Sequence, residues 1–413
     1  MHIERVVTCQ GMSGYFNKDL AAIKAGAVPD GFISIGPPRT PGFRTVVQPA
    51  EALCLMLILS DGQVALGDCI DVIFTGAAGR DPLFKAAEHQ KIIDRDIADL
   101  LQGQPLDRFQ ELADAVETLT VSGRRLHTAV RYGVTQALMD AVAKARRITM
   151  AEVIADEYGC RISEKPIPLL AVTTNDQKNN VDKMILKKAP YLPHGSSSNR
   201  KRDFGESGEP LMEYIQWIVQ RINKLREPDY HPTIHLDIYG ILGEAFDMDI
   251  SRIADFMGKM QKACGPYPLI IETPIIADGQ ARQIQIYQQL RETLKRNSIP
   301  VKIIIDEWCN TLDDIRLFAE AQAADIIQIK TPDLGGIQNS IKAVLTCKEK
   351  GAGVYVGGTA NGTDQSARVS AHIALATRAD FLLIKPGQGV DEGLMIEENE
   401  MRRTLALIQS RRA

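Results

Sequence analysis

Three short apolar segments that each end in a carboxylate constrain the fold of this chain most strongly. The segment TIHLD ends at Asp237, LIIE ends at Glu272 and KIIID ends at Asp306. The intervals are 272 − 237 = 35 and 306 − 272 = 34 residues, the length expected of one β/α unit. Isoleucine-rich segments favour buried strands. The repeated interval therefore predicts neighbouring parallel strands, each with a carboxylate at its C-terminal end.

A lysine ends a fourth segment of the same kind, DIIQIKTPDLGG, which spans Asp325–Gly336. Its strand is expected to stop near Thr331, because Pro332 cannot donate a hydrogen bond to a sheet. Lys330 would then lie at the C-terminal tip of the strand, where β/α barrels build their active sites. A lysine in this place can also simply extend to solvent, and a single carboxylate can cap a helix. Four such residues in register favour a common site.

The second half of the chain alternates strands and helices, which predicts a β/α barrel. Helical patterns separate most of the expected strands, for example at Leu211–Arg226, Ser251–Lys262 and Asp313–Ala321. The eight expected strands are Ile167–Ala171, Lys183–Leu186, Thr233–Asp237, Leu269–Glu272, Lys302–Asp306, Ile326–Lys330, Gly353–Val356 and Phe381–Ile384.

The first part of the chain has an α+β pattern, and 413 residues are too many for one ordinary core. A hairpin is expected at Leu53–Leu59 and Val64–Ala65, joined by an Asp-Gly turn. Helices are expected at Asp81–Gln102, Arg108–Val116, Leu126–Ala145 and Met150–Glu157. The predicted fold class is α/β, with an α+β domain over residues 1–160 and a barrel of the triosephosphate isomerase type over residues 161–413.

Two polar segments carry no recognised binding motif. The glycine-rich turn Gly76–Asp81 (GAAGRD) is not followed by the Lys-Ser or Lys-Thr of a phosphate loop, so we expect it to be structural. The run Gly195–Pro210 is rich in glycine and serine and predicts a long exposed loop, a candidate lid.

Composition excludes several functional classes. The net charge of −4 gives no electrostatic basis for binding nucleic acid or a membrane surface. Seven cysteines without a CxxC pair suit a reducing cytoplasm and argue against disulfides or a zinc site. The N-terminus does not resemble a signal peptide, and no apolar run reaches the length of a membrane span.

The expected cluster of carboxylates implies a metal ion and a proton-transfer reaction. Asp237, Glu272 and Asp306 would repel one another at one rim unless a cation lay between them. Oxygen ligands with open positions suit Mg²⁺. A metal-bound substrate carboxylate stabilises the charge that develops when the neighbouring carbon loses a proton. Lys330, beside a cation and partly desolvated, is expected to have a lowered pKa and to act as the base.

At this point the chain resembles a known family, 3-methylaspartate ammonia-lyase of the enolase superfamily. That superfamily pairs a lysine or histidine base with Mg²⁺. The resemblance covers essentially the whole chain. Its motifs in this sequence are DGFISIG (Asp30–Gly36), GRDPLF (Gly79–Phe84), RLHTAVRYG (Arg125–Gly133), MAEVI (Met150–Ile154), LPH (Leu192–His194), HLDIYG (His235–Gly240), IIETP (Ile271–Pro274), DEWCNT (Asp306–Thr311), QIKTPDLGG (Gln328–Gly336) and KPGQGVDEG (Lys385–Gly393).

The resemblance implies an enolase-like fold, a capping domain followed by the barrel, and elimination of ammonia from 3-methylaspartate to give mesaconate. It implies Mg²⁺ held by the three carboxylates, a monovalent activator such as K⁺, an amino diacid substrate and a homodimer. Lys330 would take the proton, and His194 would act on the opposite face as a second base or carboxylate partner. Gln328 and Thr359 would bind the two ends of the substrate. On sequence alone, a lone loop histidine such as His194 is more often polar surface.

Three positions depart from the family pattern. Ile73 and Val172 stand where the family has glutamine, and Ala360 stands where it has cysteine. The first two would face the substrate's amino group and the adjacent carboxylate, so this side of the site is predicted to be apolar and the substrate to differ there. Two alternatives remain open: another enolase-superfamily enzyme acting on a different carboxylate, and a barrel that binds without catalysis. The racemase branch fits less well, because MILKK (Met184–Lys188) lacks its Lys-x-Lys motif.

Overall fold

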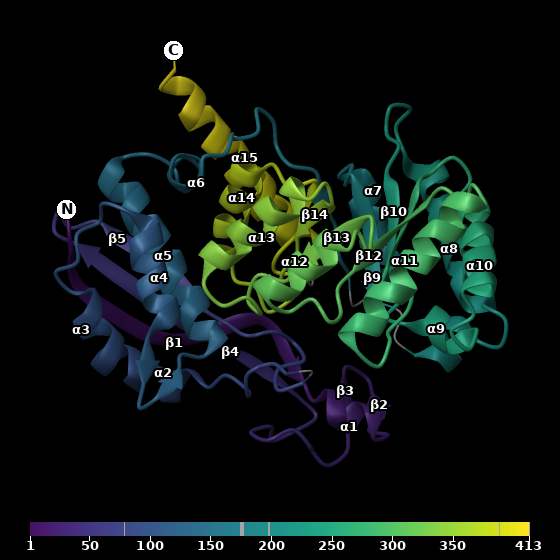
Figure 1. Ribbon diagram of the computed structural model, residues 1–413, viewed down its shortest axis with the longest axis horizontal. Coiled ribbons are helices and arrows are strands. Elements are labelled where there is room, and N and C mark those ends of the chain that lie inside the picture. The colour runs from purple at the N-terminus through teal and green to yellow at the C-terminus, as the bar shows by residue number, and fades with distance from the viewer. Residues whose placement is uncertain (78, 174–176, 197–198, 388, 413) are drawn as a thin grey trace.

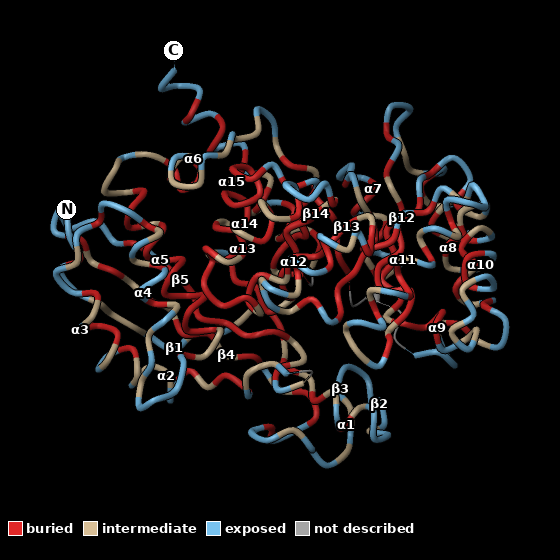
Figure 2. Tube along the Cα trace, viewed as in Figure 1, coloured by how far each residue is buried: buried red, intermediate tan, exposed pale blue. Residues whose placement is uncertain are grey.

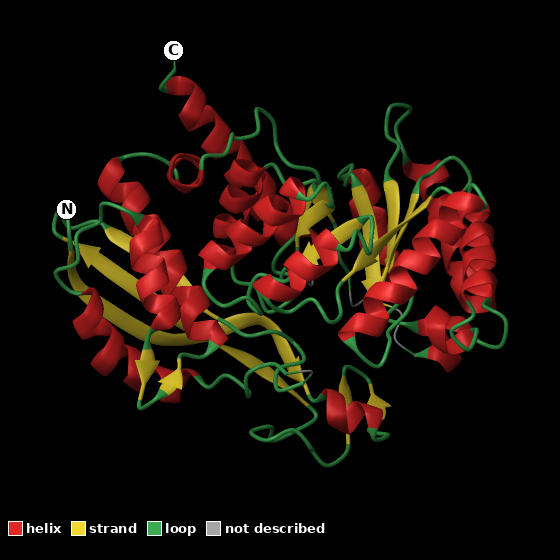
Figure 3. Ribbon diagram, viewed as in Figure 1, coloured by secondary structure: helices red, strands yellow, loops and turns green. Residues whose placement is uncertain are grey.

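The computed structural model divides into an antiparallel sheet covered by helices and a closed barrel of parallel strands (Figures 1 and 3). It describes residues 1–77, 79–173, 177–196, 199–387 and 389–412. One hydrophobic core runs through both parts (Figure 2). In the described residues, no helix has both the length and the apolar character needed to cross a membrane.

The N-terminal cap domain is built on a sheet with the strand order β1-β4-β5. The predicted hairpin is confirmed, since Ile58 of β4 pairs with Val64 of β5. The long first strand was not expected from the sequence. Most of its residues are half-buried or exposed, so it lacks a clear apolar alternation. The cap strands are β1 (Ile3–Lys18), β2 (Val28–Asp30), β3 (Ile33–Ile35), β4 (Val47–Leu59), β5 (Val64–Cys69), β6 (Thr120–Val121) and β7 (Arg124–Arg125).

Helix α5 packs on strands β4 and β5 of this sheet (Figure 1) and is the most deeply buried of the cap helices. The helix expected to begin at Asp81 begins instead at Ala86 and contains a π-helical turn. The cap helices are α1 (Leu20–Lys24), α2 (Ala86–Ile92), η1 (Ile93–Ile97), α3 (Ala98–Leu101), α4 (Phe109–Thr118), α5 (Thr128–Arg146) and α6 (Met150–Tyr158).

Helix α5 connects the cap sheet to the barrel. Two glycines, Gly67 of β5 and Gly133 of α5, allow the helix to lie directly on the strand. A Cβ atom at Gly133 would lie 2.7 Å from the carbonyl carbon of Asp68. On its barrel side, α5 contacts the loop after β13. The hydroxyl of Tyr132 lies 3.3 Å from that of Thr331, next to Lys330 in sequence.

The predicted barrel of eight parallel strands is confirmed, and it closes in the order β10-β11-β12-β13-β14-β15-β8-β9. Three predicted strands have the bounds found in the structure, and four others differ by a few residues at their ends. The barrel strands are β8 (Leu169–Leu170), β9 (Tyr191–Ser196), β10 (Thr233–Asp237), β11 (Leu269–Glu272), β12 (Val301–Ile305), β13 (Ile326–Ile329), β14 (Gly353–Val356) and β15 (Phe381–Leu383).

Helices surround the barrel and cover the outer faces of its strands (Figure 1). The expected helices at Leu211–Arg226, Ser251–Lys262 and Asp313–Ala321 are confirmed within two residues at each end. The helices of this part are α7 (Gln177–Leu186), η2 (Arg200–Phe204), α8 (Glu209–Leu225), α9 (Ile241–Ala245), α10 (Ile250–Cys264), α11 (Gln280–Arg296), α12 (Leu312–Glu320), α13 (Ile337–Glu349), α14 (Asp364–Thr377) and α15 (Val390–Ser410).

The prediction of the second barrel strand was wrong. Residues Lys183–Leu186 end helix α7, whose buried face includes Val181, Met184 and Ile185 at helical spacing. The strand is β9, which was missed because its sequence YLPHGS contains proline and glycine. MILKK therefore begins in helix α7 and not in a barrel strand, so its lack of Lys-x-Lys does not bear on the racemase branch. The true strand also contains no Lys-x-Lys motif.

The predicted long exposed loop Gly195–Pro210 was also wrong in part. Residues 197 and 198 lie outside the described residues, but Arg200–Phe204 forms a π-helical turn. Phe204 is buried against the ring of Phe256, with 5.3 Å between the centroids. This aromatic contact fixes part of a segment whose composition is otherwise that of a flexible loop.

We predict that Gly133→Ala lowers the free energy of unfolding by about 1–3 kcal/mol, because the new methyl group would push α5 away from β5. The matched control is Gly258→Ala in α10, where a Cβ atom would meet Ile299 at an ordinary distance of 3.4 Å. The control should gain up to about 1 kcal/mol from helix propensity. Urea unfolding measures both, and equal stability of the two variants would contradict the packing argument.

Candidate active site

A cavity of about 160 Å³ opens at the C-terminal ends of the barrel strands, beneath the cap domain. It is lined by all ten residues that the sequence analysis assigned to a site: Ile73, Val172, His194, Asp237, Glu272, Asp306, Gln328, Lys330, Thr359 and Ala360. The structure therefore brings the predicted site residues together, although they span the chain from position 73 to position 360.

The three carboxylates end consecutive strands, as the sequence spacing predicted. Asp237 and Glu272 are the last residues of β10 and β11 and are direct partners in the sheet register. Asp306 follows the last residue of β12. All three are buried, with Glu272 fully enclosed. Their oxygens therefore share one small, poorly hydrated space.

Burial and mutual repulsion raise the pKa values of two of these groups. Burial is the largest cause for Asp237, followed by the charges of Glu272 and Asp306, and its pKa lies well above the usual range. Burial also raises the pKa of Glu272 to about 7. A cation among these oxygens would favour their charged forms.

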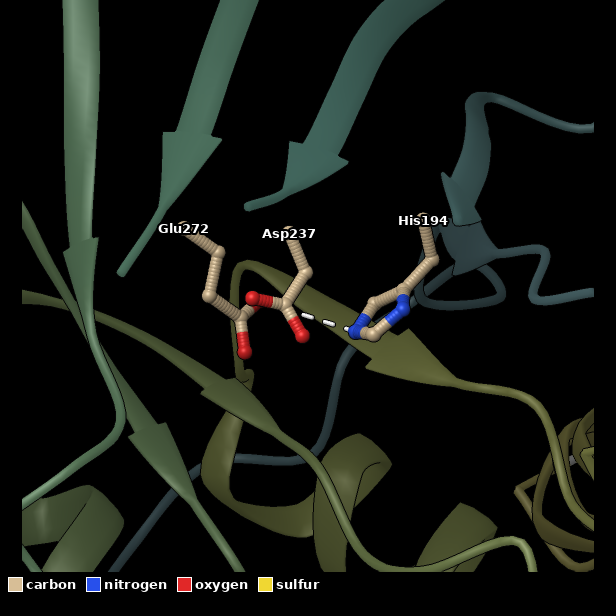
Figure 4. Close-up of side chains that lie close together, drawn as sticks. All are labelled: His194, Asp237 and Glu272. Atoms are coloured by element: carbon tan, nitrogen blue, oxygen red, sulfur yellow. Dashed lines mark ion pairs between the residues drawn. The ribbon is translucent and has the colours of Figure 1, made fainter. Parts of the chain in front are cut away.

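The side chains of His194, Asp237 and Glu272 point toward one another (Figure 4). Each offers a ligand atom within 4.8 Å of the others, which is the spacing of a possible metal site. Asp306 is not a member of this group. Its Oδ2 lies instead 2.8 Å from Nζ of Lys330.

Lys330 follows β13 directly, and its side chain is 16% exposed. Burial lowers its pKa, but the neighbouring carboxylates, above all Asp306, outweigh burial and raise the pKa above the ordinary lysine value. The predicted lowering of the Lys330 pKa was therefore wrong when only the charges of the protein act on it, because Asp306 pairs directly with the amine. Lys330 carries its proton in this arrangement.

His194 lies in β9 and lines the cavity, so the reading of it as a surface loop residue was wrong. Its Nε2 is 3.7 Å from Glu272 Oε2, and this nitrogen is buried without a hydrogen-bond partner. Burial lowers the pKa of His194 to about 4, so the imidazole is neutral near pH 7. In the barrel order, β9 and β13 are four strands apart in a ring of eight, which places His194 and Lys330 on opposite sides.

Gln328 and Thr359 are both buried in the wall of the cavity. The amide nitrogen of Gln328 donates to Glu272 Oε1 at 2.9 Å, and its amide oxygen has no hydrogen-bond partner. The Thr359 hydroxyl accepts from the N–H of Asn361 at 3.3 Å. The free amide oxygen of Gln328 is an acceptor available to a ligand.

One side of the cavity is apolar. Ile73 reaches it from the cap domain, Val172 follows β8, and Ala360 lies in the loop after β14. Leu383, the last residue of β15, extends the same wall. A Cβ atom on Gly387 would lie 3.1 Å from Val172, so this wall is closely packed.

Two buried residues missed by the sequence analysis lie against the carboxylate of Glu272. The Tyr355 hydroxyl donates to Glu272 Oε2 at 2.8 Å. His235 Nε2 lies 2.9 Å from the same oxygen, without hydrogen-bond geometry. Burial lowers the pKa of His235 to about 3, so this ring is neutral. The period-two alternation of a strand could have identified His235, because it faces the same side of β10 as Asp237.

Arg80, Tyr239 and Glu307 also line the cavity and were not assigned to it. Glu307 and Tyr239 follow strand ends closely, which is a usable sequence signal. Arg80 comes from the glycine-rich turn of the cap domain, and nothing in its local pattern marks it.

The backbone adopts left-handed conformations near the ends of four barrel strands that carry or precede residues of the cavity. His194, Tyr239, Thr273 and Trp308 have φ values of 57°, 43°, 48° and 65° at the ends of β9, β10, β11 and β12. For residues other than glycine, such conformations cost on the order of 1–3 kcal/mol each and cluster at functional sites. None of these four positions holds a glycine that would signal the turns in the sequence.

Comparisons with known proteins match the chain from end to end. The family model described as "Methylaspartate ammonia-lyase N-terminus" matches residues 1–159, and the one for the C-terminus of the same family matches residues 161–410. Methylaspartate ammonia-lyase 2 of Carboxydothermus hydrogenoformans is 47% identical over 412 residues, covering 100% of this chain and 99% of the relative.

Comparisons with solved structures point to the same family. A magnesium complex of beta-methylaspartase from Clostridium tetanomorphum matches with a TM-score of 0.96 and 45% identity, covering 100% of both chains. Methylaspartate ammonia-lyase of Citrobacter amalonaticus, containing (2S,3S)-3-methylaspartic acid, matches with a TM-score of 0.97 and 45% identity, covering 99% of this chain and 100% of the other. Muconate cycloisomerase of Pseudomonas fluorescens, at 17% identity and a TM-score of 0.59, shares the fold over 91% of this chain and 84% of its own.

The resemblance seen in the sequence motifs is thus confirmed over the full length of the chain, in both the cap domain and the barrel. This protein belongs to the methylaspartate ammonia-lyase family.

Proposed function

We propose that this protein is a Mg²⁺-dependent carbon–nitrogen lyase that eliminates ammonia from 3-methylaspartate or a related amino diacid. The observation that carries the proposal is the arrangement of three buried carboxylates with the Lys330 amine in one cavity at the barrel rim. Family membership supports the same reaction class. A barrel that binds without catalysis would not need to retain this complete set.

The donor set fits Mg²⁺. Asp237, Glu272 and Asp306 offer hard oxygen ligands, which Mg²⁺ prefers to imidazole. We therefore assign the metal to the carboxylates and leave His194 for the substrate, although His194 lies within ligand distance of two of them. A bound Mg²⁺ would supply positive charge that stabilises a substrate carboxylate as the adjacent carbon loses its proton.

Lys330 and His194 take the proton-transfer roles in this proposal. Lys330 would first release its own proton to solvent and then remove the proton from one face of the substrate, while the bond to the amino group breaks and ammonia leaves. His194, neutral and on the opposite side of the barrel, would contact a carboxylate or serve as a base for the other face. Gln328 and Thr359 would orient the two ends of the diacid.

The apolar wall favours a substrate altered on one side. Ile73, Val172 and Ala360 offer neither a donor nor an acceptor from their side chains, so an ammonium group facing them would lack partners. A substrate that is N-substituted or bulkier on the amino-bearing side would fit this wall better than 3-methylaspartate. This second candidate keeps the reaction type and changes the substrate.

Several finer features belong to the same proposal. K⁺ would act as a monovalent activator, and the active form would be a homodimer, as the family resemblance implies. The boundary between the cap domain (1–160) and the barrel domain (161–413) is supported by the separate family models for the two parts. Cytoplasmic location is supported by seven free cysteines.

We predict that Lys330→Ala lowers the rate of proton transfer by about 10²–10⁴-fold, the usual contribution of a positioned base. The variant should still fold and bind Mg²⁺, since Lys330 lies at a strand tip. Ammonia release and exchange of the substrate proton with deuterated buffer measure the effect. Lys302→Ala, at an exposed position of the neighbouring strand β12, is the matched control. Exchange at the parental rate in Lys330→Ala would exclude Lys330 as the base.

We predict that the double variant Ile73→Gln with Val172→Gln raises kcat/KM on 3-methylaspartate at least about tenfold. Each restored hydrogen bond to a charged group is worth roughly 1.5–3 kcal/mol. Two would give about two to four decades if their effects added, which neighbouring sites often do not.

The matched control for this double variant is Val28→Gln with Ile33→Gln on the exposed hairpin β2–β3, which should leave kcat/KM unchanged. If 3-methylaspartate proves to be the best substrate of the parent, and the double variant is no faster on it, then Ile73 and Val172 do not set specificity.

A further inference from the structure

Among the described cap-domain residues that line the cavity, Arg80 is the charged one. Among the described lining residues, four come from the cap domain, and the other three are Val72, Ile73 and Phe74. The Arg80 side chain is only 8% exposed. A buried guanidinium at the boundary between cap and barrel needs an explanation, because burying a charge is costly unless it is paired.

Arg80 belongs to the glycine-rich segment Gly76–Asp81, whose first and last residues are fixed within the cap domain. The N–H of Gly76 donates to the carbonyl of Asp81 at 2.8 Å, which closes the turn. The carboxylate of Asp81 accepts from the N–H of Thr128, the first residue of α5, at 2.7 Å. Arg80 therefore projects from an anchored support.

The guanidinium of Arg80 crosses to two loops of the barrel. Its Nε donates to Asp333 Oδ2 at 2.8 Å, and Asp333 is only 6% exposed. Its Nη2 donates to Asn310 Oδ1 at 3.3 Å. Asp333 lies in the loop after β13, and Asn310 lies in the loop after β12. One side chain thus joins the cap domain to both loops.

These loops follow the two residues of the central ion pair. The N–H of Asp333 donates to the carbonyl of Lys330 at 3.1 Å, so the residue held by Arg80 is bonded to the backbone of Lys330. Lys330 in turn lies 2.8 Å from Asp306, which precedes the loop that contains Asn310. Arg80 therefore makes one hydrogen bond to the loop that follows Lys330 and one to the loop that follows Asp306.

We infer that Arg80 is a positioning residue: from the cap domain it fixes the two barrel loops that hold Lys330 and Asp306, and so directs the Lys330 amine into the cavity. This inference rests on the proposed function. The glycine-rich turn, which carries no phosphate-binding motif, then has a structural role. It places Arg80 at the boundary between the cap domain and the barrel.

Binding of a substrate carboxylate by Arg80 is the competing explanation. An arginine that recognises a carboxylate does so through two parallel donors. The Nε of Arg80 is already used by Asp333, and its charge is balanced by that buried carboxylate. The two roles predict different kinetics, because loss of a substrate contact raises KM, whereas a misplaced base lowers kcat.

The test compares Arg80→Ala, Arg80→Lys and the parent as full-length, Mg²⁺-loaded protein. We expect Arg80→Ala to lose about 10²-fold in kcat, the cost of misplacing a reacting group by about 1 Å, with KM changed by less than about threefold. Millimolar guanidinium should restore part of kcat. Arg80→Lys, which keeps the charge but not the fork, should fall between the two.

Hydrogen–deuterium exchange supplies a readout independent of activity. In Arg80→Ala, amides of residues 330–336 should exchange faster than in the parent, while those of β10 and β11 should not change. Lys342→Ala is the matched control, because it removes an exposed ion pair with Asp114 across the same boundary and outside the cavity. It should change neither kcat nor exchange of 330–336.

The outcomes separate this inference from the proposed function. A rise in KM at constant kcat, or unchanged kcat together with unchanged exchange of residues 330–336, overturns the positioning role. If the parent releases no ammonia from any amino diacid, the proposed function fails. The exchange measurement then still decides whether Arg80 holds the loop after β13.

Discussion

Repulsion among three buried carboxylates is the constraint on which the rest of the site depends. Asp237, Glu272 and Asp306 end consecutive strands of a closed barrel, so the fold itself forces them together. Burial and mutual charge raise the pKa values of Asp237 and Glu272. The Lys330 ammonium offsets part of this charge through Asp306. The remaining demand for positive charge is what suits the site to a divalent cation.

The surrounding residues hold this unfavourable arrangement in place. Tyr355 and Gln328 donate to the two oxygens of Glu272, and both come from strands on the far side of β12. Arg80 bonds to the loops after β12 and β13 from the cap domain. Left-handed backbone at four strand ends adds strain that the packed barrel must support. The strained backbone lowers the local stability of these strand ends, and the packed barrel keeps the site residues in a fixed geometry.

The sequence predicted the barrel and its acidic rim because both depend on local patterns, namely isoleucine-rich strands and the interval between Asp237, Glu272 and Asp306. The prediction failed at β9, because Pro193 and Gly195 are uncommon inside strands. The apolar residues Met184 and Ile185 indicated a strand where the chain forms a helix. The pKa of Lys330 could not be predicted, since it depends on a distance to Asp306 that only the folded barrel sets. Arg80 was invisible for a related reason: its partners Asp333 and Asn310 lie more than 200 residues away.

Titration of Mg²⁺ into EDTA-treated protein, followed by calorimetry and by ammonia release from 3-methylaspartate, tests the central claim most directly. The proposed metal site predicts no turnover before addition of metal, one Mg²⁺ bound per chain, and recovery of activity in parallel with binding. It also predicts that Asp237→Asn loses both signals. Full activity in metal-free buffer, or unchanged Mg²⁺ binding by Asp237→Asn, would contradict the claim that the carboxylate rim holds the metal on which the reaction depends.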